Sequence, residues 1–588
     1  MKYKRTWGVL CLALACAALA PVAAQEPAKV PVVEVELDNG LKMLLVRRPE
    51  LTTVSAAWVA KVGSADERPG ITGMAHLFEH MMFKGTKTIG TTNIERDLEI
   101  IDEQEALQNE IREIYREQRE RFRRGEIEDP YATDARPQEL IDLETEFTKL
   151  VEEQREIMVK DEYDKIYTSE GQSFLNAFTS TDVTVYLNRI PANKLELWFW
   201  MESDRLLNPV FREFYAERDV VYEERRLRTE STPTGEFDEQ LNAMFWQSHP
   251  YSWPTIGWPS DLRVISKEQA DDFFRTYYAP NNITAVLVGN FEIDRVKELA
   301  ERYFGRLPRG PEAPDVVTLE MNQKAEKRLS AECDCQPQIE IRYHTESFVN
   351  QKSYPLDVLA GVLSGRTGRL FKTMVEGSEV ASRASASHLP SKFAGYFSFL
   401  AETKGESTPA DLEAAWDEVV ADLQENLVSE EELRKVKNRE IADTYRRLQD
   451  PLFLSIQLAL YEGQGDYRYL DTLQTNVEAV TAEQIREAAR TYLVPERRLV
   501  GHYTRKSGSK AEEVPPELTD VPAEQRQAIL AQLRQLRSFG DAEQLQAIAE
   551  QIEAQAGQAP PEMKPVVELM LRTAKERLAE LEGDGGEE

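Results

Sequence analysis

The apolar positions near the start of the chain form short runs that indicate β-strands. Val32 to Leu37 and Leu41 to Val46 flank Asp38-Asn39-Gly40, and apolar runs that meet at Asn-Gly predict a β-hairpin. Val54 to Val62 predicts another strand, and Ile283 to Val288 predicts a buried one. Stretches with helical spacing separate these runs, so we predict that the first large unit mixes α and β structure.

Residues 95–165 carry a different pattern, in which apolar side chains recur at helical intervals among dense charge. The segment from Gly125 to Pro137 interrupts this periodicity once. We therefore predict a helical hairpin that is inserted into the first unit and projects from it, with its charged residues on a solvated face.

Two segments that lie 215 residues apart repeat the same signals. Ser266 to Gln269 and Thr481 to Gln484 each form a Ser/Thr-x-x-Gln capping box, and Pro280 or Pro495 ends the helical stretch that follows. Each copy then enters an apolar strand. The match predicts a duplicated domain, and the proline-rich segment 306–315 is the expected linker.

Beyond about Arg505 the chain is rich in alanine, glutamine and glutamate, which predicts a helical extension with an acidic end. The pattern thus divides the chain into four expected parts. They are a leader at residues 1–24, a first domain at 32–310, a second homologous domain at 311–505 and the extension at 506–588.

The leader has the pattern of a cleaved export signal. Lys2, Lys4 and Arg5 precede an apolar run from Trp7 to Ala20, and small residues follow at 22–24. No later stretch reaches the roughly 20 apolar residues that a membrane span needs. We expect an exported protein, periplasmic or extracytoplasmic, without a membrane span.

Composition narrows the function classes. A formal charge of −32 with 41 % apolar residues describes an acidic globular protein, and nucleic acid is not an expected partner because phosphate backbones attract basic surfaces. Cys333 and Cys335 are the only cysteines beyond the leader. Their spacing cannot tie distant elements together, and without a second cysteine pair they are not expected to bind a metal.

Two of the six histidines lie in His76-Leu-Phe-Glu79-His80. On a helix this spacing places His76 and His80 on one face, close enough to share a tetrahedral metal ion, with Glu79 beside them. The stretch from Met74 to Phe83 is otherwise apolar, and buried ionisable groups need partners that a divalent cation supplies. The pattern also matches the His-x-x-Glu-His signature of inverzincins.

A catalytic zinc ion needs a further protein ligand, and the segment from Glu217 to Glu224 offers one. Glu217 and Glu224 are nearly two helical turns apart and share a face, whereas Glu223 points about 100° away. An acidic helix face that simply meets solvent is the alternative, and the pattern alone leaves both open. The remaining histidines show no ligand spacing and are expected to be structural or surface residues: His249, His344, His388 and His502.

Three segments, in order, resemble the pitrilysin/insulinase metallopeptidases, which include the mitochondrial processing peptidases. They are Gly73-Met-Ala-His-Leu-Phe-Glu-His-Met-Met-Phe-Lys-Gly-Thr86, Asn176-Ala-Phe-Thr-Ser180 and the helix from Glu217 to Glu224. The resemblance spans about residues 32–505. It implies an α/β (α+β) fold of two homologous domains, each a largely antiparallel sheet with helices, to which the helical hairpin and the helical extension are added.

The resemblance also implies one Zn²⁺ per chain, bound by His76, His80 and Glu224. It assigns Glu79 as the catalytic base and gives Glu217 an auxiliary catalytic role near the metal.

Asn176 and Ala177 match the family's edge strand, which hydrogen-bonds an extended peptide substrate. One departure concerns spacing, because His80 and Glu224 lie 144 residues apart, about twice the gap usual in the family. Without the 71 residues of the insertion the gap is 73, close to the usual one.

The second copy lacks the motif, since the repeat sets Val362 opposite His76 and Arg366 opposite His80. Many members of the family carry an Arg, and a Tyr seven residues later, that contact substrate from the half facing the zinc. The resemblance places Val375 and Ser382 at these positions. We therefore expect a second, related subunit to supply both groups in a heterodimer, with a homodimer of altered chemistry as the second alternative.

Together these features predict an exported zinc-dependent endopeptidase that hydrolyses peptides or unfolded protein segments, with Glu79 activating the hydrolytic water. The alternative from another class is a non-catalytic peptide-binding or assembly subunit of a peptidase-like complex, which the intact set of site residues disfavours. A metal hydrolase with a non-peptide substrate is a further alternative, and the edge strand at Asn176 disfavours it.

Overall fold

The computed structural model describes residues 29–506 and, beyond them, 515–518, 529–530, 532–533, 535–537, 539, 542–556 and 563–584. The leader predicted at residues 1–24 lies outside this range. The chain divides into two compact units, with the boundary between Arg505 and Lys506. Among the described helices, none combines the length and the apolarity needed to cross a bilayer.

The first sheet has six strands in the spatial order β1-β2-β6-β3-β5-β4, and only β2 and β6 run parallel. Its strands are β1 (Val33–Glu36), β2 (Lys42–Arg47), β3 (Thr53–Ala60), β4 (Phe174–Thr179), β5 (Thr184–Pro191) and β6 (Ile283–Gly289). The predicted hairpin is confirmed, because β1 pairs with β2 and Gly40 adopts the left-handed φ of 90° that such a turn favours. The strands predicted after it are confirmed as β3 and β6.

The second sheet has the order β7-β11-β8-β10-β9, and only β7 and β11 run parallel. Its strands are β7 (Lys327–Cys333), β8 (Gln338–Thr345), β9 (Ala381–Pro390), β10 (Gly395–Thr403) and β11 (Arg498–Arg505). Order and directions match β2-β6-β3-β5-β4 of the first sheet, which confirms the predicted duplication. The domain boundaries at 310 and 505 stay predictions.

The helices of the first copy are α1 (Met74–Met81), α2 (Ile94–Arg123), α3 (Gln138–Ile157), α4 (Glu162–Ser169), α5 (Leu195–Leu207), α6 (Phe214–Arg225), α7 (Gly235–Phe245), α8 (Pro259–Leu262), α9 (Lys267–Tyr277) and α10 (Ile293–Tyr303). Those of the second copy are α11 (Ser353–Leu363), α12 (Pro409–Glu425), α13 (Glu430–Gln449), α14 (Pro451–Gln464), α15 (Tyr469–Ala479) and α16 (Ala482–Tyr492). The two predicted capping boxes are present, at the starts of α9 and α16.

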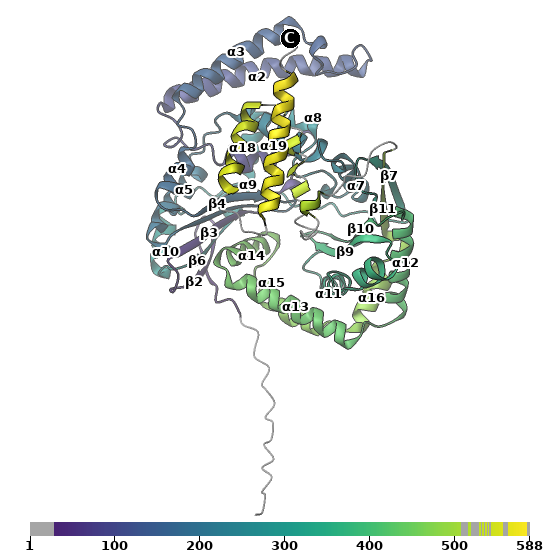
Figure 1. The fold of residues 1–588 in the computed structure, drawn as a ribbon. Helices are drawn as coiled ribbons and strands as arrows, with labels where there is room; N and C mark the ends of the chain where they lie inside the picture. The colour runs from purple at the N-terminus through teal and green to yellow at the C-terminus, as the bar shows by residue number, and fades with distance from the viewer. Residues whose placement is uncertain are drawn as a thin grey trace, which may run out of the picture. The chain divides into compact units, whose positions relative to one another are not determined.

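Each copy covers the sheet of the other with one helix (Figure 1). α14 packs on the first sheet, where Leu454 and Leu458 join an apolar face of β2, β3, β5 and β6. α7 packs on the second sheet, where Phe237 and Leu241 join β7 and β11. The other face of the first sheet meets α1, α5, α9 and α10. Burial of both faces explains why its strands are continuous apolar runs.

The predicted helical hairpin is confirmed as α2 and α3, and side-chain contacts tie it to the first domain. Near its base, Asp97 forms a fully buried ion pair with Arg212 at 2.5 Å. Tyr215 of α6 contacts side chains of both hairpin helices. In the loop between them, the centre of the Tyr131 ring lies 4.5 Å from the guanidinium carbon of Arg263. A buried charge pair and aromatic contacts therefore hold the hairpin against the first domain.

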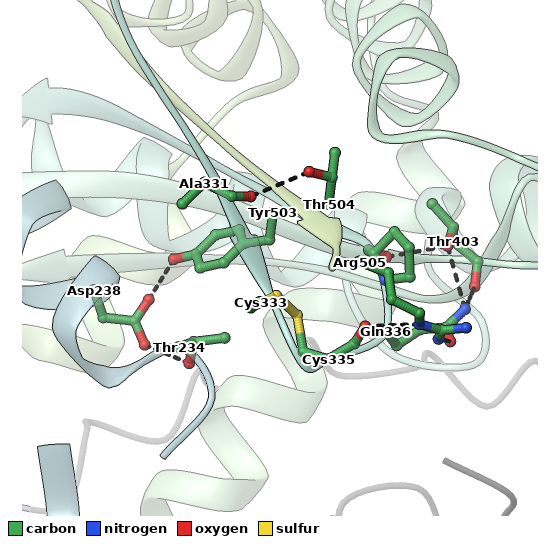
Figure 2. Close-up of a disulfide and its surroundings, with 11 residues drawn as sticks. Thr234, Asp238, Ala331, Cys333, Cys335, Gln336, Thr403, Tyr503, Thr504 and Arg505 are labelled. Atoms are coloured by element: carbon green, nitrogen blue, oxygen red, sulfur yellow. Dashed lines mark hydrogen bonds between the residues drawn. A yellow bond between two sulfur atoms is a disulfide. The ribbon is translucent and has the colours of Figure 1, made fainter. Parts of the chain in front are cut away.

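Cys333 and Cys335 form a disulfide at the end of β7 (Figure 2). Arg505 of β11 donates from Nε to the Cys335 carbonyl at 3.2 Å. Beside the disulfide, Tyr503 of β11 donates to Asp238 of α7, which ties the second sheet to its covering helix. The disulfide itself connects no distant elements, as the spacing of the two cysteines predicts.

The second unit contains α18 (Ala542–Ala556) and α19 (Lys564–Asp584), which pack against each other. Leu545 and Ala549 of α18 form a small apolar cluster with Ala574 and Leu578 of α19. The helical extension is thus confirmed for the residues that the structure describes.

Candidate metal centre and its cleft

The helix α1 carries the His-x-x-Glu-His residues and begins at Gly73, whose φ of 91° is left-handed. A Cβ on Gly73 would lie 2.6 Å from the backbone oxygen of Ile256, so only glycine fits here. The buried carboxylate of Glu67 accepts hydrogen bonds from the backbone N–H groups of Gly73 and Ala75, at 2.9 and 2.7 Å. Glu67 thereby satisfies N–H groups in the first turn and fixes the start of the helix.

His76, His80 and Glu224 come together between α1 and α6. Glu224 Oε2 lies 3.8 Å from His76 Nε2 and 3.5 Å from His80 Nε2. Two ligands of a tetrahedral zinc ion with bonds near 2.1 Å are about 3.4 Å apart, so the three side chains fit such an ion. Among the described residues, this is the only group of three or more His, Cys, Asp or Glu side chains spaced to hold a metal.

Glu217 lies nearly two helical turns before Glu224, on the same face of α6. It bonds to His80 and is not a member of the potential ligand set. Its Oε1 lies 2.8 Å from His80 Nδ1, and its Oε2 lies 2.5 Å from the ammonium of Lys84. Burial alone raises the pKa of Glu217, but the hydrogen bond to His80 and the charge of Lys84 lower it to about 2. A carboxylate that holds the second ring nitrogen of a ligand histidine fixes the orientation of that ring.

His76 is in the form that a metal requires. Burial lowers its pKa to about 3, and the charges of His80 and Arg228 act in the same direction. The ring is therefore neutral at physiological pH, and a neutral imidazole is the ligand form. Burial lowers the pKa of His80, but the hydrogen bond to Glu217 and the charges of Glu217 and Glu224 raise it more, so the net shift is upward. A metal ion therefore has to displace a proton from His80 more often than from His76.

Glu79 lies beside the ligands without joining them. Its Oε2 accepts a hydrogen bond of 2.7 Å from Thr179 Oγ1, at the end of β4. Burial raises the pKa of Glu79, and the bond from Thr179 opposes part of this rise. A glutamate with a raised pKa is a better general base at neutral pH than an exposed one.

Arg228 is a partner of the centre that the sequence pattern did not single out. It lies in the π-helical segment Arg226–Glu230 that follows α6, and its Nη1 is 2.6 Å from Glu224 Oε1. The two carboxylate oxygens of Glu224 thus have different partners: Oε2 faces the two histidines, and Oε1 faces the guanidinium of Arg228. Glu223 instead pairs with Arg226, and both side chains are more than half exposed, so the predicted separation of Glu223 from the centre is confirmed.

The strand β4, which carries Asn176 and Ala177, is the last strand of the first sheet. Among the residues that the structure describes, no strand pairs with its outer edge, as the predicted edge-strand role requires. The Ala177 N–H donates to Asn176 Oδ1 at 2.8 Å. A peptide that pairs here must therefore replace this contact, and its binding at this edge stays a prediction.

A cleft of about 730 Å³ opens beside the metal centre. Glu79 and His80 line it from α1, and Leu175 to Ala177 line it from β4. Arg155 and residues 158–162, all from the predicted insertion, line it as well. No sequence pattern indicated that the insertion would contribute to the cleft.

In the second copy, α11 follows β8 as α1 follows β3, and it contains no histidine. Val362 is buried in the second core. His388 of β9 forms hydrogen bonds with Asp357 of α11 at 2.7 Å and with Thr345 at 3.1 Å. Both of its ring nitrogens therefore bind protein groups, not a metal ion. The remaining histidines also have protein neighbours, namely the Tyr251 N–H for His249, Phe245 for His344 and Glu413 for His502.

Two family models match the chain. The one described as "Insulinase (Peptidase family M16)" covers residues 42–105, and the one described as "Peptidase M16 inactive domain" covers residues 265–440. The zinc protease PqqE of Helicobacter pylori is 25 % identical over 451 residues, which cover 75 % of this chain and 85 % of the relative. These matches support a family-level assignment of the chain to the insulinase family, peptidase family M16. A second M16-like relative, the uncharacterized zinc protease YmxG of Bacillus subtilis, is 22 % identical over 77 % of this chain and 93 % of its own length.

Solved structures share the M16 fold with this chain. A protease from Helicobacter pylori superposes with a TM-score of 0.66 at 21 % identity, over 80 % of this chain and 99 % of that one. Pitrilysin gives a TM-score of 0.59 at 16 % identity, over 83 % of this chain but 46 % of its own length. One M16 chain of this kind therefore corresponds to about half of pitrilysin.

Proposed function

We propose that this M16 chain is an exported zinc-dependent endopeptidase that cleaves peptides or unfolded protein segments. The observation that carries the proposal is the convergence of His76, His80 and Glu224 on one point, with Glu79 beside them. An open sheet edge borders the same cleft, which suits an extended peptide. Export rests on the basic and apolar pattern of residues 1–24.

His76, His80 and Glu224 would hold a zinc ion, which would supply Lewis-acid polarisation of the scissile carbonyl. Thr179 holds Glu79 Oε2, which leaves Oε1 to take the proton from the attacking water. The same carboxyl group then delivers that proton to the leaving amine nitrogen. Glu217 keeps the His80 ring oriented throughout, and Lys84 keeps Glu217 ionised.

The match to the "inactive domain" model does not argue against this chemistry. That match covers residues 265–440, whereas the four residues of the centre lie between 76 and 224. A non-catalytic peptide-binding subunit remains the second candidate function, since the second copy has the fold without the motif. The intact base Glu79 favours the enzyme, because binding alone does not need a base.

The substitution Glu79→Gln tests the proposal. It removes the base but leaves all three metal ligands, so zinc content should stay at one ion per chain while hydrolysis falls by about 10²–10⁴-fold. Zinc is measured by elemental analysis, and hydrolysis is measured with an internally quenched peptide. Turnover close to that of the wild type would rule out this role for Glu79.

A further inference from the structure

The C-terminal end of the insertion reaches the catalytic cleft. Arg155 and residues 158–162 line the same cavity as Glu79, His80 and the edge strand β4. A peptide that lies along β4 with its scissile bond near Glu79 therefore has insertion residues within reach. The insertion therefore forms part of the wall of this cleft.

This part of the cleft wall is held rigidly. The Val159 N–H donates to the Gly90 carbonyl at 3.0 Å, and the Gly90 N–H donates to Glu162 Oε2 at 2.5 Å. Between them, Asp161 adopts a left-handed φ of 56°, which is unusual for a residue with a side chain. Backbone strain of this kind persists only where the surroundings fix it, so the wall is preorganised.

Most carboxylates that line the cleft already form hydrogen bonds or ion pairs with other residues of the protein. Glu213 accepts contacts from Lys84 at 3.3 Å and from Arg155 Nε at 3.4 Å. Glu217 is held by His80 and Lys84, and Glu162 by the backbone of Gly90. The exception is Asp161 on the wall itself, whose side chain makes no hydrogen bond as a helix cap.

Two basic side chains of the cleft wall, Arg155 and Lys160, have charged groups that are not fully paired with carboxylates. Lys160 is exposed, and its ammonium has no acceptor among the described residues. Arg155 is 59 % exposed and uses Nε for its single long contact with Glu213, so its two Nη groups are left to bind another partner. Beside them, Met158 and Leu175 offer apolar surface in the cleft.

We propose that the insertion builds a substrate subsite in which Arg155 and Lys160 bind the carboxylate of an aspartate or glutamate in the peptide. The planar guanidinium of Arg155 suits a carboxylate, and such charge-assisted hydrogen bonds are the strong ones. Met158 and Leu175 pack against the methylene groups of the same side chain. The subsite deepens the proposed peptidase function and rests on it.

The test uses the zinc-loaded Glu79→Gln chain, in which binding is measured without cleavage. Fluorescent peptides of one sequence, with Glu, Gln or Lys at each position in turn, are titrated and followed by anisotropy. At one position the Glu peptide should bind about tenfold more tightly than the Gln peptide, and the Lys peptide should bind more weakly still. Adding Arg155→Gln and Lys160→Gln should abolish this difference.

Arg123→Gln is the matched control, because it removes one charge from the exposed end of α2, outside the cleft. It should leave the preference for Glu intact. Equal binding of Glu and Gln peptides at every position would overturn the subsite, and so would a preference that survives the double substitution.

Failure of the proposed function gives a different result. A wild-type chain that prefers Glu peptides through Arg155 and Lys160 but hydrolyses none of them would support the subsite while contradicting the peptidase.

Discussion

At the scale of single residues, the centre depends on side chains that use their two polar atoms for different partners. His80 directs Nε2 toward Glu224 and binds Glu217 through Nδ1. Glu224 directs Oε2 toward the histidines and binds Arg228 through Oε1. On His80 and Glu224, the potential ligand atom is therefore aimed by a contact made on the far side of the same group, which is the arrangement that tunes metal sites in general. His76 has no such contact, because its buried Nδ1 has no hydrogen-bond partner among the described residues.

Arg228→Gln should weaken zinc binding by about tenfold, at the lower end of the range for groups that support metal ligands, because Arg228 is 72 % exposed. The affinity is measured by competition with a chromophoric chelator. Arg226→Gln removes the same charge two residues earlier, from a guanidinium that pairs with Glu223. It should change the affinity little, and equal effects of the two substitutions would show that Arg228 acts only through overall charge.

The grouping of His76, His80 and Glu224, with Glu79 beside them, was predictable from sequence because it is local to one helix or follows a known pattern. Arg228 was within reach of the same reasoning, since it follows Glu224 by four residues and such spacing favours an ion pair. Thr179 was not, because its contact with Glu79 joins residues 100 positions apart and depends on how β4 meets α1.

At the scale of elements, the insertion joins the fold through Arg212. Its guanidinium binds Asp97 of α2 and donates to the carbonyls of Lys84, Thr86 and Ile89. Arg212 thereby connects the insertion to the chain that follows α1. Helical periodicity predicted α2 and α3 correctly but carries no information about a buried ion pair, so this connection was not predictable from the sequence.

Removing residues 95–165 should destabilise the first unit by about 3–5 kcal/mol, because Arg212 would keep its buried charge without Asp97. Removing only residues 120–138 with a short Gly/Ser linker should cost far less, since that cut leaves the ion pair intact. Urea unfolding of both deletions measures the difference. If the larger deletion does not fold, Asp97→Asn in the full chain provides the same comparison.

Equal stability of the two deletions would contradict the role assigned to the buried pair.

The sequence also did not predict that α7 packs on the second sheet and α14 on the first, each on the sheet of the other copy. The repeat predicted two related domains, and their matching strand orders confirm it. An apolar helix face, however, does not specify which of two similar sheets it covers. Packing therefore crosses the linker at 306–315, and residues up to Arg505 form one compact unit rather than two.

At the scale of the whole molecule, the positions expected to contact substrate from a facing half lack the required chemistry. Val375 packs against the second core, and Ser382 donates to the backbone of Glu402 at 3.4 Å. Neither side chain supplies a guanidinium or a phenol. We propose that a related exported subunit provides these groups in a heterodimer, and a homodimer is the second possibility.

Adding the related subunit should raise peptide hydrolysis by about 10²-fold, the scale expected for a contact to a developing oxyanion. Light scattering before and after mixing measures whether the two chains associate, and the quenched-peptide assay measures the gain. Full activity from a monomer of this chain alone would contradict the proposal.

The zinc content of a matched pair of variants tests the central claim most directly, because it needs neither a partner nor a known substrate. Glu224 is the proposed ligand that α6 brings to the histidines, and its neighbour Glu223 pairs with Arg226. We predict one zinc ion per chain in the wild type and in Glu223→Gln, and loss of most zinc in Glu224→Gln after equal dialysis. Full zinc in Glu224→Gln, or loss of zinc from Glu223→Gln, would contradict the assignment of the metal centre.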